Sequence, residues 1–292
     1  MSKNTITNWL DNSNPDTDNS DHIDWYRIVP FILLHIAALA VFWVGFSWVA
    51  MWTAVALYVL RMFAITGFYH RYFSHRNFKT SRIVQFLFAF IGATSAQRGP
   101  LWWASHHRAH HVHSDTERDI HSPRQQGFLW SHTLWFLSNK NFDTDLSRIK
   151  DFAKFRELRW LDRFDILPPV ILGVSLFAVG WLLEIYNPDL GTTAGQMLVW
   201  GMFVSTVVLY HATYTINSLS HVFGKRRYET KDDSRNNFLL ALITLGEGWH
   251  NNHHYFPATV RQGFKWWEID ISFYILKLMS FVGLVWELQP IP

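Results

Sequence analysis

Long apolar blocks without charge alternate with polar, histidine-rich segments along this 292-residue chain. From Ile28 to Leu60 there is no Asp, Glu, Lys or Arg, which is a run of 33 residues. A helix of that length extends roughly 50 Å, whereas the apolar core of a bilayer is about 30 Å thick. The apolar run continues past Arg61 to Tyr69, with a natural turn near Gly45. The pattern therefore predicts a helical hairpin in a membrane.

A second apolar pair follows, and the predicted spans cover about 28–47, 49–69, 166–184 and 196–217. We expect an all-α integral membrane protein with four transmembrane helices in two hairpins. Segments 70–165 and 218–292 are expected to form a helical domain on one side of the membrane. Residues 26–292 are expected to fold as a single domain, and the polar N-terminal residues 1–25 to be disordered.

Lys and Arg are concentrated on one side of these spans. Of the 26, 15 lie between the second and third spans and 8 after the fourth, and none lies in a hairpin turn. By the positive-inside rule, both termini and the helical domain are expected to be cytoplasmic. Arg61 lies inside the second span, where it is either functional or snorkels to the interface. The net charge of +3 follows from this topology, and no nucleic-acid recognition motif is present.

Two apolar stretches, 83–97 and 266–288, are too short or too interrupted by charge to span comfortably. We expect the first to lie at the interface or dip into the membrane, and the second to be interfacial or packed against the protein.

Nine of the 16 histidines are grouped in three boxes and one further position: His70 and His75; His107, His110 and His111; His250, His253 and His254; and His221. Positions i, i+3 and i+4 share one helix face, so each HxxHH box presents three imidazoles together. His70 and His75 are five residues apart, roughly 140° around an α-helix. We therefore expect the helix to bend or end between these two, or the two to bind different metals.

Clustered neutral imidazoles are ligands for iron, zinc, copper or nickel. One ion needs three or four protein ligands, so nine histidines predict two ions. His106, His113 and His121 are close enough to the second box to orient its ligands. The chain has no cysteine, which excludes disulfides, zinc–thiolate sites and iron–sulfur clusters. Electrons for redox chemistry are therefore expected from another protein.

With these motifs the chain resembles the membrane-bound fatty acid desaturases, in the acyl-CoA Δ9 branch typified by stearoyl-CoA desaturase and in its bacterial form. The resemblance covers about residues 25–290. It is carried by His70-Arg-Tyr-Phe-Ser-His75, His107-Arg-Ala-His-His111, Asn217-Ser-Leu-Ser-His221 and Gly246-Glu-Gly-Trp-His-Asn-Asn-His-His254.

The resemblance implies an O2-dependent acyl-CoA desaturase that inserts a cis double bond, expected at Δ9, into a saturated chain. It implies two iron ions held by the nine boxed histidines, with Asn217 bound through water. It also implies a separate electron donor of ferredoxin, rubredoxin or cytochrome b5 type.

Departures from the family pattern leave alternatives open. His106 stands where relatives of the animal branch carry Asp, and residues 97–103 are typical of bacterial members that act on acyl-CoA or on acyl chains already in lipids. An acyl-lipid desaturase and a membrane di-iron hydroxylase of alkanes or sterols are therefore alternatives. A membrane metal carrier is the non-enzyme alternative, although carriers place polar ligands near the bilayer midplane.

Overall fold

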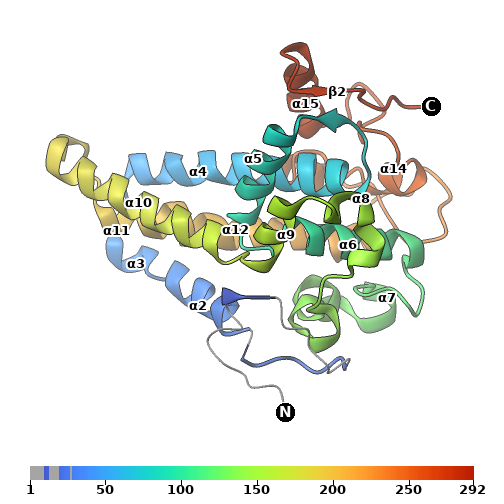
Figure 1. The fold of residues 1–292 in the computed structure, drawn as a ribbon, viewed down its shortest axis with the longest axis horizontal. Coiled ribbons are helices and arrows are strands. Elements are labelled where there is room, and N and C mark those ends of the chain that lie inside the picture. The colour runs from blue at the N-terminus through green and yellow to red at the C-terminus, as the bar shows by residue number, and fades with distance from the viewer. Residues whose placement is uncertain (1–9, 13–19, 27) are drawn as a thin grey trace.

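The computed structural model describes residues 10–12, 20–26 and 28–292, and this part of the chain is mostly helical. The expected disorder of residues 1–25 concerns a segment of which 1–9 and 13–19 lie outside the described residues. Several helices run side by side along one axis, and others gather at one end of it (Figure 1). The former are α2 (Val29–Ala38), α4 (Trp48–Phe63), α10 (Leu167–Tyr186) and α12 (Ser205–Asn217), and the latter include α6 (Pro100–His113), α7 (Pro123–Gln126) and α14 (His250–Tyr255).

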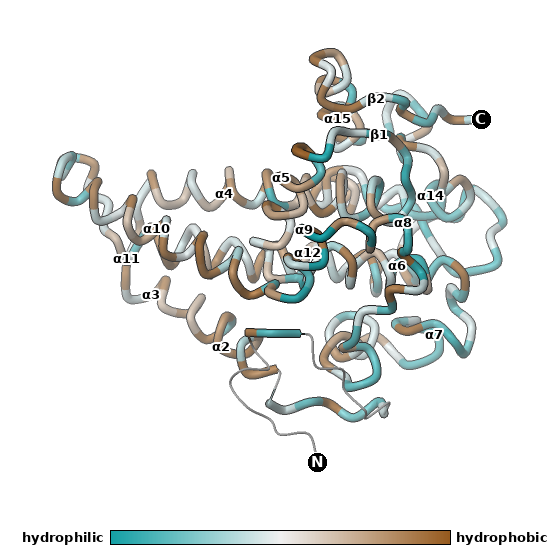
Figure 2. Tube along the Cα trace, in the orientation of Figure 1, coloured by the Kyte–Doolittle hydropathy of each residue, from teal (hydrophilic) through white to brown (hydrophobic). Residues whose placement is uncertain are grey.

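Three helical stretches are long and apolar enough to cross a membrane: Trp48–Ser74, Leu167–Tyr186 and Ala194–His221. The first joins α4 to the π-helix η1 (Ala64–Ser74). The third contains α11 (Ala194–Leu198), η7 (Val199–Val204), α12 and η8 (Leu219–His221). These stretches coincide with three of the four predicted spans, and their apolar character is visible along the chain trace in Figure 2.

The remaining predicted span, 28–47, is a shorter apolar helix over Val29–Val44. It consists of α2 and α3 (Val41–Val44), separated by Leu39 and Ala40. The N–H groups of these two residues bond three residues back, to Ile36 and Ala37, which tightens the helix there. Sixteen residues of helix extend about 24 Å, which is less than a full apolar core.

The predicted turn near Gly45 is present. Gly45 ends α3 with a φ of 74°, a conformation that favours glycine, and the Ser47 side chain caps α4 by accepting from the Ala50 N–H. The Ser47 hydroxyl also bonds to Thr192 at 2.7 Å, in the turn of the second hairpin. The amide of Gln196 donates to the Val44 carbonyl at 3.0 Å. The two turns are thereby fixed to each other.

Arg61 is fully buried rather than snorkelling. Its guanidinium donates to the hydroxyl groups of Ser205 and Thr206 on α12 and to the carbonyls of Leu57 and Thr94. These neutral oxygens satisfy a charge that would otherwise be costly inside an apolar bundle. Arg61 therefore joins α4 to α12.

Most of the remaining helices and strands gather at the end opposite the turn between α10 and α11 (Figure 1). Helix α5 (Arg82–Ala93) lies in the predicted stretch 83–97 and α15 (Ile271–Phe281) in the stretch 266–288. Both expose apolar side chains, among them Ile83 and Phe281. The others are η2 (Trp130–Leu134), η3 (Trp135–Leu137), η4 (Asn139–Asn141), η5 (Leu146–Ile149), α8 (Lys150–Ala153), α9 (Arg156–Arg163), η6 (Pro188–Leu190), α13 (Phe238–Ile243) and the antiparallel pair β1 (Lys79–Thr80) and β2 (Val285–Trp286).

Candidate metal centre

All nine boxed histidines come together, in two groups that can each hold a metal ion. The five-histidine group contains His70, His75, His107, His111 and His253. The four-histidine group contains His110, His221, His250 and His254. Helix α6 and helix α14 each supply ligand candidates to both groups, so the two HxxHH boxes bridge the groups.

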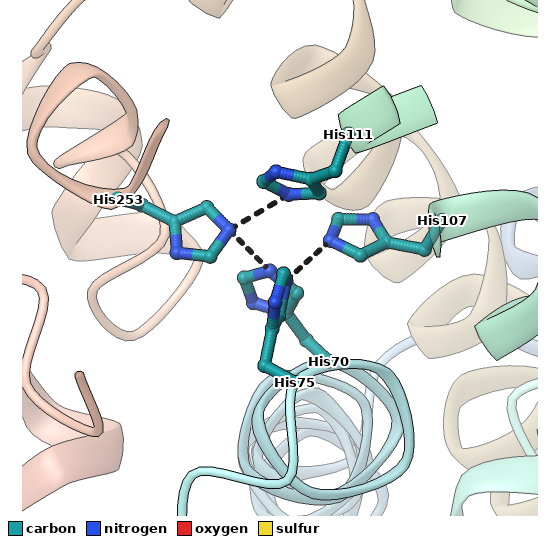
Figure 3. Close-up of side chains that lie close together, drawn as sticks. All are labelled: His70, His75, His107, His111 and His253. Atoms are coloured by element: carbon teal, nitrogen blue, oxygen red, sulfur yellow. Dashed lines mark hydrogen bonds between the residues drawn. The ribbon is translucent and has the colours of Figure 1, made fainter. Parts of the chain in front are cut away.

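The five-histidine group brings η1, α6 and α14 to one point, with the imidazole rings turned toward a common centre (Figure 3). The Nε2 atoms of His70 and His253 are 2.9 Å apart, and those of His253 and His111 are 3.0 Å apart. The Nε2 atoms of His75 and His107 are 2.9 Å apart. Two nitrogens that lie about 2.1 Å from one ion at roughly a right angle are separated by about 3 Å, so these spacings suit ligands of a single ion.

The π-helix explains how His70 and His75 reach the same group. A π-helix bonds residue i to residue i+5, and the His75 N–H donates to the His70 carbonyl at 3.2 Å. The two residues therefore lie one above the other instead of on different faces. The helix ends at Ser74, between the two histidines as expected, but the expectation of different metals for the two residues is not needed.

The four-histidine group is built from α6, the end of the third long stretch and α14. The Nε2 atoms of His221 and His250 are 3.0 Å apart. The Nε2 atoms of His110 and His254 are buried and have no hydrogen-bond partner. Buried polar atoms are normally satisfied, so these nitrogens are open toward a ligand.

Four carboxylates that the sequence argument missed stand behind the histidines. Asp119 accepts from Nδ1 of His110 at 3.0 Å, Asp115 from His221 at 2.8 Å and Asp232 from His254 at 2.7 Å. Glu247 accepts from Nδ1 of His70 in the other group. Each carboxylate fixes the proton on Nδ1 and leaves the Nε2 lone pair for a metal, as is usual for metal-binding histidines.

The proton count supports this assignment. Because His221 donates from Nδ1 to Asp115, its Nε2 is an acceptor, and so His250 would have to donate from its own Nε2. A cation that takes the lone pairs of both Nε2 atoms frees His250 from this donor role, and its proton then lies on Nδ1, which has no partner among the described residues. The residues therefore fit a metal ion.

Burial keeps most of these imidazoles neutral. Burial, together with the neighbouring histidines, holds the pKa values of His75, His107, His111 and His253 well below their ordinary range. Burial acts in the same direction on His110, but the charge of Asp119 outweighs it and raises the pKa of His110. The neutral imidazole is the form that binds metal.

The other predicted positions lie around these groups. His121 stacks on His110 with 4.2 Å between ring centroids, and both belong to a third set of donors with Asp119. The Nδ1 atom of His106 donates to the Trp102 carbonyl of its own helix at 2.9 Å. His113 is in neither group. Asn217 is half-buried at the end of α12, where it lines the cavities described next.

Two cavities meet at the histidines. The larger is lined mostly by aromatic and aliphatic side chains, including Phe31, Trp135 and Tyr210, and it reaches His107 and Asn217. The smaller lies between the two groups, because His70 and His107 line it together with His110 and His250. Both cavities share Trp103, His107, Thr213 and Asn217. An apolar chain in the larger cavity would therefore lie beside the histidine groups.

Helices long enough to cross a membrane, two histidine groups that can hold metal and an apolar cavity are features of membrane metalloenzymes that act on apolar substrates. Residues 46–277 match the family model described as fatty acid desaturase. This chain belongs to the fatty acid desaturase family, and it is an oxidoreductase of lipid metabolism. The resemblance inferred from the motifs is thus confirmed at the level of the family.

Individual relatives carry different names. The chain is 35% identical to an acyl-CoA 5-desaturase of Anemone leveillei, over 94% of this chain and 85% of the relative. It is 35% identical to an sn-1 stearoyl-lipid 9-desaturase of Anabaena variabilis, over 92% of this chain and 94% of the relative. An sn-2 palmitoyl-lipid 9-desaturase of Nostoc is also 35% identical, with 92% of each chain covered.

Proposed function

We propose that this protein is an O2-dependent fatty acyl desaturase that inserts a cis Δ9 double bond into a saturated acyl-CoA. Two electrons come from a separate donor protein. The observation that carries the proposal is the convergence of nine histidines in two groups at the end of an apolar cavity. The names of the Anabaena and Nostoc relatives support the Δ9 position.

The proposed site holds two iron ions, one in each histidine group, with Asn217 acting through water. Bound there, iron would supply the oxidising power that removes hydrogens from two adjacent methylenes, which zinc cannot do because it has no redox chemistry. The reaction balances as one saturated chain, one O2, two electrons and two protons giving one alkene and two waters.

The side chains of this protein have separate tasks in that reaction. The aromatic wall of the larger cavity, with Phe31, Trp135 and Tyr210, binds the acyl chain and excludes water. Trp103 and Thr213 line both cavities and therefore position the chain where it passes His107. Holding one carbon–carbon bond at a fixed place selects the position of the double bond. The four carboxylates keep the Nδ1 protons of their histidines in place.

An acyl-lipid substrate is the second candidate. It is favoured by two of the relatives, which are named as acting on stearoyl-lipid and palmitoyl-lipid, whereas another is named an acyl-CoA desaturase. Purified, iron-loaded protein with a reducing system would be given labelled stearoyl-CoA and vesicles of distearoyl lipid in parallel. If a labelled oleoyl product forms from only one of these two substrates, that result shows whether the acyl chain is bound to CoA or to a lipid.

We also propose that the chain crosses the membrane four times, with both termini and the histidine centre in the cytoplasm. The concentration of Lys and Arg at one end supports this orientation. The proposal treats α2 and α3 as the first crossing. A C-terminal alkaline phosphatase fusion should be inactive in a bacterial host, and an active fusion would contradict the orientation.

The first test of the function is the cellular fatty-acid profile. The wild type, His253→Ala and His113→Ala would be expressed in a host that makes no Δ9 monoenes, and double bonds would be located by gas chromatography–mass spectrometry. We expect a new cis-Δ9 alkene from the wild type and from His113→Ala, which removes a histidine outside both groups, and none from His253→Ala. A hydroxylated chain would instead indicate the alkane or sterol hydroxylase. Bound metal with no product under a supplied reductant would favour the metal carrier.

A further inference from the structure

The segment 224–235, hereafter the basic loop, is fixed to helix α14 by the residues between the histidines of the third box. Asn251 accepts the N–H groups of Arg227 and Tyr228, both at 2.8 Å, and donates to the Tyr228 carbonyl at 3.0 Å. Asn252 accepts from the amide of Asn236, the residue that follows the loop, at 2.7 Å. These bonds hold the loop against α14, which lies at the end of the molecule opposite the turn between α10 and α11 (Figure 1).

The basic loop also contacts the four-histidine group from outside. Its Asp232 is the carboxylate that accepts from Nδ1 of His254 at 2.7 Å. The N–H of Asp233 donates at 2.8 Å to Asp115, the carboxylate bound to His221. The loop therefore forms an outer wall of the centre, and in the chain it lies close to His221.

The outer face of the basic loop carries basic side chains around two stacked tyrosines. Lys225, Arg226, Arg227 and Lys231 are exposed, as is one acid, Glu229, whereas Asp232 is buried. Arg226 and Arg227 have acidic partners in Asp233 and Glu268, but Lys225 and Lys231 have none among the described residues.

Within this rim, Tyr228 stacks on Tyr255 with 4.3 Å between ring centroids and 6° between planes. Tyr255 is 44% exposed and directly follows His254 in the chain. An aromatic centre inside a charged rim is the composition of a protein–protein interface.

We propose that the basic loop and the Tyr228–Tyr255 pair form the docking surface for a small acidic protein that carries one electron at a time. This inference rests on the proposed function, which requires a separate reductant. Each reduced carrier gives up one electron and leaves oxidised. Two carriers per double bond supply the two electrons that, with O2, two protons and the two hydrogens of the chain, yield two waters. A carrier docked here delivers its electron next to His254.

Binding of defined carriers to the full-length, iron-loaded protein tests the surface without relying on turnover. The probes are an acidic [2Fe–2S] ferredoxin and an acidic cytochrome b5, measured by biolayer interferometry at low salt and at about 0.3 M salt. Exposed charge pairs are screened at the higher salt, so the affinity should fall there. At low salt we expect Lys225→Glu with Lys231→Glu to weaken binding roughly tenfold, because both changes reverse rim charges.

Matched controls separate this surface from general charge. Arg156→Glu with Arg159→Glu makes the same charge change at two exposed arginines of α9 and should leave the affinity within about twofold. Tyr255→Ala should weaken binding, whereas Tyr255→Phe keeps the stacked ring and should retain it. Equal effects of the loop and α9 variants, or no salt-sensitive binding of either probe, would overturn the proposal.

The outcome is distinguishable from a failure of the proposed function. If the loop variants bind like the wild type while the wild type still forms alkene in cells, the docking surface is wrong and the desaturase stands. If the probes bind at the loop but the wild type forms no oxidised chain with them, the desaturase proposal fails while the surface survives as a binding site.

Discussion

The two histidine groups are supplied largely by the same helices but differ in what stands behind their rings. In the four-histidine group, three of the four members donate from Nδ1 to an aspartate. In the five-histidine group, within the described part of the chain, only His70 has a carboxylate behind it, and that carboxylate, Glu247, is shared with Arg71. The first group is therefore an anionic environment for a cation, and the second is held mainly by neutral nitrogens.

Two iron ions bound in these groups would therefore occupy inequivalent sites. Carboxylates behind histidines raise the basicity of the ligand nitrogen and stabilise a more highly charged ion. In the four-histidine group, histidine partners hold the pKa values of Asp115, Asp119 and Asp232 well below their ordinary range even though burial acts in the opposite direction. These aspartates are therefore charged at neutral pH, and the two sites should differ in affinity.

Removing one histidine from each group has the largest expected effect. His107→Ala takes a ligand from the five-histidine group, and His221→Ala takes one from the four-histidine group. We expect each variant to lose all measurable desaturation, because the chemistry needs both ions, yet to retain about one of two irons by elemental analysis. His113→Ala is the control on α6. If either variant lost both irons, the groups would have to be treated as one coupled site.

Neutralising the aspartates should weaken iron binding in the four-histidine group alone. Asp232→Asn and Asp115→Asn keep the size of the side chain but remove the charge behind His254 and His221. We expect the iron of the four-histidine group to be bound roughly 10–100-fold more weakly, with the other iron unchanged. Timed release to a chelator, followed by elemental analysis, measures both. Equal weakening of the two irons would contradict the asymmetry.

Glu247→Gln should act mainly on stability. Glu247 contacts His70 and also pairs with the fully buried Arg71, whose Nη2 lies 3.0 Å from its Oε1. Asp270 remains beside Arg71 at 2.9 Å, so the guanidinium keeps one of two partners. We expect the free energy of unfolding to fall by roughly 2–3 kcal/mol, less than for a fully unpaired buried charge. Thermal unfolding in detergent measures this, and an unchanged midpoint would show that Asp270 alone balances Arg71.

The histidines of both groups could be predicted from the sequence because their spacing is local. Three imidazoles at i, i+3 and i+4 define a helix face whatever the rest of the chain does. The long apolar stretches were predictable for the same reason, since composition within one segment decides them. The first span is the exception, because its break at Leu39 and Ala40 has no Gly or Pro signal.

Two of the three aspartates behind the histidines were not predictable, because the contacts that define them are distant in sequence. Asp115 and His221 are 106 residues apart, and Asp232 and His254 are 22 apart. In the sequence these acids look like ordinary charges of polar loops. His70 and His75 were placed on different faces because the argument assumed an α-helix, and nothing in the motif indicates a π-helix. The signal that the sequence offered for these acids was the closeness of Asp115 and Asp119 to the second histidine box.

The smallest effect on the asymmetry is expected from Asp162, which supports both groups at once. Its carboxylate accepts from the Trp102 N–H at 2.8 Å and so caps α6, which carries histidines of both groups. Burial raises the pKa of Asp162 to about 6. The folded protein then holds this proton more tightly than the unfolded chain does. Its contribution to stability is therefore present below about pH 4 and is lost as the pH rises to about 6.

In metal-free protein this loss should amount to about 3 kcal/mol for Asp162 between those pH values. Asp162→Asn keeps an acceptor for the Trp102 N–H but does not titrate, so its stability should lack this fall. Thermal unfolding of both proteins from pH 4 to 7 measures the difference. Because α6 serves both groups, the variant should bind the two irons in the wild-type ratio at neutral pH. A selective loss of one iron would mean that the cap positions His107 and His111 independently of His110, and the asymmetry would then lie in α6 rather than in the aspartates.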